Sequence, residues 1–111
     1  MTIGKAVNAL GIMAYAQEHG EFGADEVTKA MNGGVRKYEQ ALQALVHSGF
    51  LYGKRGPRGG YEITDMGKIV DAWTVLSAIG VGNHEWMLRM LRAYSPKISP
   101  KKAYAMATNN E

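Results

Sequence analysis

The run GKRGPRGG at residues 53–60 constrains the fold more than any other part of the sequence. Residues that favour β-structure stand on both sides of it, FLY at 50–52 and YEIT at 61–64. Glycine and proline supply the backbone angles of a tight connection, so the sequence predicts a β-hairpin. Its tip carries Lys54, Arg55 and Arg58, and three neighbouring cations repel one another unless something anionic meets them. The tip therefore indicates an anionic partner.

Helical patterns precede the hairpin. Apolar residues at helical spacing predict a first helix over residues 2–19, ended by Gly20. A second helix is expected over residues 24–31, followed by the turn NGG at 32–34. The third begins directly after this turn and ends at Gly49. It has Tyr38 and Leu42 on its apolar face. A short helix, a glycine turn and a second helix predict a helix-turn-helix, which the hairpin extends to a winged helix-turn-helix.

The charge is concentrated in the same region. The whole chain of 111 residues has a net charge of +3. Residues 36–58 hold five Lys and Arg residues and one acidic residue, so this short stretch alone carries +4. A local basic patch of this kind attracts polyanions such as DNA.

The run HSGFLYGKRGPRGGYEIT resembles the winged helix-turn-helix of bacterial transcription regulators. RGPRGGY resembles the wing of the repressor family that contains the iron-sulfur-cluster and nitric-oxide-sensing regulators. YEITDMGK is similar to the wing exit of many MarR-type and PadR-type regulators. The resemblance covers about residues 3–70 and implies that the third helix enters the major groove, with the wing tip along the neighbouring backbone or minor groove. Sensing members of that family hold their cluster on cysteines, and this chain has none, so no cofactor is expected.

Residues of the third helix and the wing are the predicted DNA contacts. Arg36 and Lys37 fall in the first turn of the third helix, where cations oppose the helix dipole unless an anion compensates them. Gln40 has the amide that pairs with adenine, and Gln43 lies one turn further along. The wing cations are expected to project from the same side of the domain as Arg36 and Lys37 and to contact the DNA backbone, which positions the protein without reading sequence. The predicted DNA-binding residues are Arg36, Lys37, Gln40, Gln43, Lys54, Arg55 and Arg58.

Residues 65–111 are predicted to form a helical extension after the winged region of residues 1–64, within one compact domain. Thr64 is the expected cap of one helix that runs to about residue 79, and Asn83 of the next. The family dimerises through a helix after the wing. The dimer contacts predicted on these helices are Ile69, Trp73, Leu76, Trp86 and Met90. Alternatively, the helices fold back onto their own domain. Near the end, Ser99 and Pro100 begin either a further helix or an SPKK tail that binds the minor groove.

Catalytic and metal-binding patterns are weak. The HExxH zinc motif begins at His84 but has Leu88 in place of its second histidine, and no GxxxxGK[ST] phosphate loop is present. No uncharged run approaches the roughly 18 to 20 apolar residues that span a bilayer. We therefore expect neither an enzyme nor a metal site, no membrane partner, and a cytoplasmic location.

The sequence thus predicts a mainly α fold with a small β-hairpin, a winged helix-turn-helix followed by C-terminal helices. The expected function is that of a sequence-specific DNA-binding transcription regulator, a repressor, that binds double-stranded DNA as a homodimer. Two alternatives stay open. One is a winged-helix interaction module of phage or plasmid origin that binds host transcription or replication machinery, and the other is a DNA-binding replication or partition protein.

Overall fold

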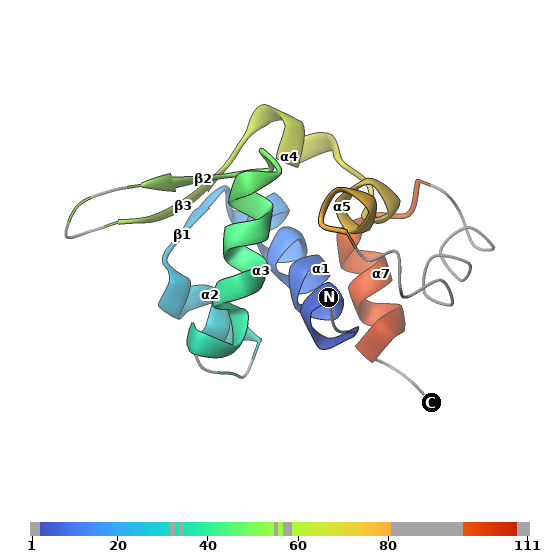
Figure 1. Ribbon diagram of the computed structural model, residues 1–111, viewed down its shortest axis with the longest axis horizontal. Helices are drawn as coiled ribbons and strands as arrows, with labels where there is room; N and C mark the ends of the chain where they lie inside the picture. Colours follow the sequence, from blue (N-terminus) through green and yellow to red (C-terminus); the bar gives the residue numbers. More distant parts are fainter. Residues whose placement is uncertain are drawn as a thin grey trace.

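The computed structural model describes residues 3–31, 33, 35–54, 56, 59–80 and 97–108. Helices and a small sheet alternate along the chain, and the helices surround α1 (Figure 1). The elements are α1 (Ile3–His19), β1 (Glu21–Phe22), α2 (Ala24–Ala30), α3 (Val35–His47), β2 (Leu51–Lys54), β3 (Gly60–Ile63), α4 (Asp65–Ile69), α5 (Ala72–Ala78) and α7 (Pro100–Thr108). This is the mainly helical winged fold that the sequence predicts. None of the described helices is long and apolar enough to cross a membrane.

The core is built around α1, whose buried face carries small and medium apolar side chains. Ala6, Leu10 and Met13 are fully enclosed there. Small residues such as Ala6 let neighbouring helices approach closely, and α3 and α7 pack on opposite sides of α1 (Figure 1). The helix ends at Gly20, which has φ of 79°, a left-handed conformation that favours glycine. The predicted first three helices are therefore confirmed to within a residue or two.

The hairpin belongs to a three-stranded antiparallel sheet with the strand order β1-β3-β2. Phe22 pairs with Tyr61, and Tyr61 pairs with Gly53. Because successive side chains of a strand alternate between its faces, these three residues share the inner face, with Leu51 and Ile63. Tyr52, Lys54, Glu62 and Glu21 share the outer face. The predicted hairpin is confirmed, whereas the third strand, β1, was not predicted from the sequence.

The expectation of one continuous helix after the wing is wrong. Val70 has an extended backbone (ψ 145°) and separates α4 from α5. Asp71 then starts a new helix, because its Oδ1 accepts a hydrogen bond from the backbone N–H of Thr74 at 2.7 Å. As a result Ile69 is 83% exposed and Leu76 is 0% exposed, so the two do not share a face. The predicted cap holds, since Thr64 Oγ1 accepts from the N–H of Gly67.

The C-terminal helix α7 folds back onto the domain. Its first turn is capped by Ser99, whose Oγ accepts from the N–H of Lys102 at 3.1 Å. Ile98 and Ala103 are buried, and Lys101 Nζ bonds Glu18 of α1 at 2.7 Å. Residues 99–108 are thus a capped helix on its own domain, as one of the two readings of this segment predicts. The helix predicted from Asn83, with Trp86 and Met90, lies outside the described residues.

Candidate nucleic-acid interface

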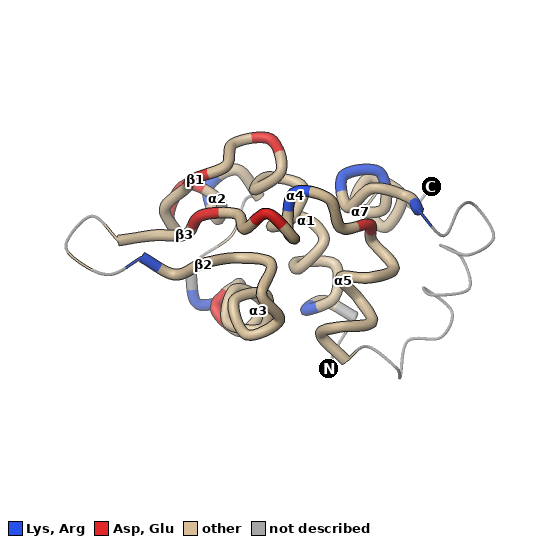
Figure 2. The backbone as a smooth tube through the Cα atoms, turned by 90° about the horizontal axis from the view of Figure 1, so that it is seen from above, with Lys and Arg blue, Asp and Glu red and all other residues tan. Residues whose placement is uncertain are grey.

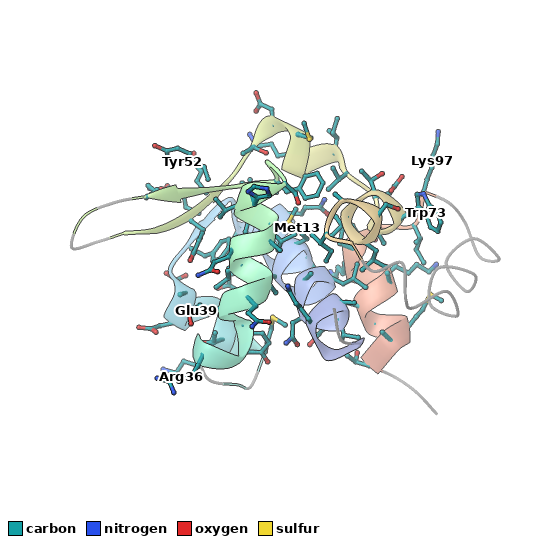
Figure 3. The ribbon with its side chains drawn as sticks, viewed as in Figure 1. Met13, Arg36, Glu39, Tyr52, Trp73 and Lys97 are labelled. Atoms are coloured by element: carbon teal, nitrogen blue, oxygen red, sulfur yellow. The ribbon has the colours of Figure 1, made fainter. Side chains whose placement is uncertain are left out.

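The outer face of α3 is a continuous polar stripe. The five exposed residues on this stripe are Arg36, Glu39, Gln40, Gln43 and His47. Their spacing places them within one face of a helix of 3.6 residues per turn. Tyr38, Leu42 and Leu45 on the opposite face are buried. Arg36 stands at the N-terminal end of α3 and projects away from α1 (Figure 3). Lys37 is in the same turn of α3, but its side chain lies outside the described part of the structure.

Tyr38 stabilises the turn between α2 and α3, which sets the orientation of α3. Its phenol donates a hydrogen bond to the carbonyl oxygen of Met31 at 3.1 Å, which ties α3 to the end of α2. Gly33 lies directly against the ring, since a Cβ built there would be 2.6 Å from the Tyr38 Oη. A residue with a side chain at position 33 would have to displace this ring or the turn. The glycine of the turn and the tyrosine of the helix therefore fix the direction of the polar stripe together.

Two shallow grooves flank α3. The wing-side groove is lined by Gln43, Val46, His47, Gly53 and Tyr61. The α1-side groove is lined by Lys5, Gln40, Gln43, Ala44 and His47. Gln43 and His47 line both grooves and so form the ridge between them. Gly53, which has no side chain, leaves room in the wing-side groove above Tyr61, whose ring stacks on Phe22 with centroids 5.7 Å apart.

The wing contributes one described cation, Lys54, at the end of β2. Its Nζ forms an ion pair with the carboxylate of Glu21 on β1. Both side chains lie on the outer face of the sheet, which also carries Tyr52, 62% exposed and directed away from α3 (Figure 3). Lys54 therefore does not point in the same direction as Arg36, as was expected of the wing cations. Its side chain lies on the outer face of the sheet, whereas Gly53 belongs to the inner face. Arg55 and Arg58 lie outside the described residues.

The backbone positions of the basic residues of β2 and α3 nevertheless lie along one edge of the molecule, although other basic positions occur elsewhere, for example on α7 (Figure 2). Viewed from above, β2 is the strand nearest α3, and the Lys and Arg positions at the end of β2 and the start of α3 succeed one another along this edge (Figure 2). Acidic positions lie around β1 and β3, farther from α3 (Figure 2). Glu39 is the exception, as an acidic residue on α3 itself. Compared with the side that carries β1 and β3, the α3 side therefore has the more positive field.

No metal-binding cluster of three or more His, Asp or Glu side chains occurs among the described residues. The described histidines belong to other settings. His47 is on the polar stripe of α3, and His19 stacks on Tyr15 with ring centroids 4.0 Å apart.

A helix-turn-helix formed by α2 and α3, followed by a hairpin that pairs with a short strand before α2, defines the winged helix-turn-helix fold. The chain is similar over its whole length to the solved structure of CymR (YrzC), described as the global cysteine regulator of B. subtilis. The TM-score is 0.62, with 14% sequence identity, and the match covers 100% of this chain and 98% of CymR. This similarity shows the fold, and it does not distinguish the two families that the wing sequence resembles. No family model matches the chain, and no curated protein matches it.

Proposed function

We propose that this protein is a sequence-specific DNA-binding transcription regulator that acts in the cytoplasm as a repressor. The observation that carries the proposal is the polar stripe of α3, where Arg36, Gln40 and Gln43 are exposed on a helix whose other face is anchored in the core. An α-helix of about 10–12 Å diameter fits a major groove about 12 Å wide. The stripe offers side chains that read base edges there.

Each side chain of the stripe has a chemical role in this proposal. The glutamine amides carry a donor and an acceptor, so Gln40 and Gln43 can pair with N6 and N7 of adenine. Arg36 offers a planar guanidinium to guanine or to a phosphate near the helix start. Lys37 would add a second cation in that turn. Together these residues would give the helix both base-reading and backbone contacts.

The wing supplies backbone contacts in the same proposal. Arg55 and Arg58, with Lys54 at the tip end of β2, would meet phosphates beside the groove that α3 occupies. Such contacts position the protein without selecting sequence. Their removal should therefore lower the affinity for every DNA sequence by the same factor. If a dimer neutralises roughly six to eight phosphates, log affinity should fall against log salt concentration with a slope of about −5 to −7.

The proposed regulator acts as a homodimer through its C-terminal helices. Ile69 and Met66 on α4 are 83% and 54% exposed, and large apolar side chains in contact with water favour a partner. Trp73 on α5 is partly exposed, and Trp86 and Met90 are further contacts predicted from the sequence. Leu76 is removed from this set because its side chain is enclosed in its own core. A two-fold dimer would bind half-sites about one DNA turn apart.

Binding selection from a pool of random DNA, followed by titration of the enriched sequence, tests the proposal. We expect Arg36→Ala and Gln43→Ala each to lower affinity by about ten-fold, which is close to 1.4 kcal/mol. Gln43→Ala should also relax the preference at one base pair. The matched control is Lys68→Ala, which removes a cation from α4 that already pairs with Asp65. A sequence-specific role would be contradicted if no sequence is enriched. It would also be contradicted if Arg36→Ala and Gln43→Ala bind the selected DNA as tightly as the control Lys68→Ala does.

A further inference from the structure

We propose that the α1-side groove binds a second strand of the DNA backbone, with Lys5 of α1 as its phosphate contact. This inference rests on the proposed function and adds a contact surface on the flank of α3 opposite the wing. The groove is formed by residues that are far apart in sequence, with Lys5 on α1 and Gln40, Gln43, Ala44 and His47 on α3.

The first step is the position of the groove. Gln43 and His47 form the ridge between the wing-side and α1-side grooves. A helix in the major groove has one sugar-phosphate strand along each flank, because the groove is only about as wide as the helix. If the ridge enters the major groove, the wing-side groove faces one strand and the α1-side groove faces the other.

The second step is the chemistry of the groove lining. Among the described residues, the lining has the ammonium of Lys5, the amides of Gln40 and Gln43 and the imidazole of His47, and it has no carboxylate. The depression beside β1 differs, because Glu21 and Glu26 line it with Lys54. Hydrogen-bond donors around a cation suit a phosphate oxygen, whereas paired carboxylates repel one. The α1-side groove therefore has a lining that suits a backbone strand, which the depression beside β1 does not.

The third step is the position of Lys5 within its own helix. Lys5 is the third residue of α1, and the first turn of α1 has no acidic residue. A cation at the positive end of a helix is unfavourable for the free helix, and a bound phosphate at that end offsets it. The same mismatch occurs at Arg36 in the first turn of α3, which likewise has no acidic residue. The proposed DNA-binding surface thus includes the N-terminal ends of two helices, α1 and α3, and each of these ends carries a cation.

The experiment compares Lys5→Gln with Lys102→Gln in titrations of the selected DNA at several salt concentrations. Lys102 is an exposed lysine on α7, which packs on the side of α1 opposite α3 (Figure 1). We expect Lys5→Gln to weaken binding several-fold and to make the salt slope shallower by about 0.9 for each phosphate that is no longer neutralised, equally on the selected and a scrambled sequence. Lys102→Gln should change neither quantity, and Lys5→Arg should retain both.

The outcomes separate this inference from the function on which it rests. An unchanged affinity and slope for Lys5→Gln, together with weaker binding by Arg36→Ala, would overturn the Lys5 contact and leave the proposed function standing. No change for either variant would overturn both. Phosphate ethylation interference on the unaltered protein gives a second measurement that needs no variant to fold. Interference on both strands beside each half-site supports the two-groove arrangement, and interference on the wing-side strand alone overturns it.

Discussion

Lys54 on β2 forms an ion pair with Glu21 on β1 across the outer face of the three-stranded sheet. The pair joins the two outer strands, because β3 lies between them. A wing cation that the sequence assigns to DNA is therefore already partnered within the chain. For Lys54 to contact a phosphate, its ammonium must exchange one anion for another, which reduces the net gain from the contact.

Glu21→Gln should consequently tighten DNA binding about two- to five-fold, the order expected when an exposed ion pair of under about 1 kcal/mol no longer competes. The substitution keeps the size of the side chain and removes its charge. Fluorescence anisotropy with a labelled duplex at low salt measures the change. The effect should shrink as salt is added, because exposed charges are screened within about 10 Å at 0.1 M.

A double-mutant cycle with Lys54→Ala assigns this effect to the ion pair. In the Lys54→Ala background, Glu21→Gln should change affinity much less than in the wild type. If the gain is the same in both backgrounds, Glu21 acts by repelling DNA directly and Lys54 makes no phosphate contact. Glu62→Gln, on the same outer face of β3, is the control for a general decrease in negative charge.

Gly67→Ala should destabilise the fold by about 1–3 kcal/mol or more, as overpacking of a well-packed site does. A methyl group at position 67 would overlap the carbonyl oxygen of Phe50 and lie 2.8 Å from Cγ1 of Ile63. Urea denaturation monitored by circular dichroism measures the decrease in stability. Gly53→Ala is the control, since a Cβ there has no neighbouring atom within 4 Å, and its stability should stay within about 0.5 kcal/mol of the wild type.

Tyr104 should make the fold less stable at alkaline pH. Burial raises the pKa of its phenol above the ordinary value, and the nearby Tyr38 raises it further. The native state therefore holds this proton more tightly than the unfolded chain, so the stabilisation is complete below the ordinary tyrosine pKa of about 10 and is lost as pH rises through the native pKa. Tyr104→Phe should remove this part of the decline in unfolding free energy above pH 10. Identical pH slopes for the two proteins would contradict this role.

Local signals in the sequence predicted the elements that depend on local chemistry. Gly20 and Gly49 both adopt positive φ at the ends of helices, and Thr64 and Ser99 cap the helices that follow them. The pattern at residues 65–79 led to the wrong prediction of one continuous helix. Val70 is apolar and keeps the helical spacing, although its backbone is extended. Asp71 was the readable signal of a new helix, since aspartate favours the N-cap position.

Features that depend on long-range contacts were not readable. β1 has two residues and exists through its pairing with β3, where Glu21 lies opposite Glu62. The groove beside Lys5 needs the packing of α1 against α3, which no local pattern encodes. The polar stripe of α3 was predictable because one helix carries all of it. The α1 flank of the proposed interface required the three-dimensional structure.

Ile69→Asp should convert the proposed dimer to a monomer without unfolding the chain. The side chain is 83% exposed in the single chain, so an aspartate there remains in water and the stability of the monomer should change by less than about 0.5 kcal/mol. In a dimer interface the same carboxylate would lose its hydration without a partner, at a cost of several kcal/mol. Analytical ultracentrifugation over a range of concentrations measures the mass, and Ser77→Asp, at an exposed position of α5, is the control for added charge. Two outcomes would contradict a dimer interface on α4. One is a wild-type protein that sediments as a monomer at every concentration, and the other is an Ile69→Asp protein that still dimerises.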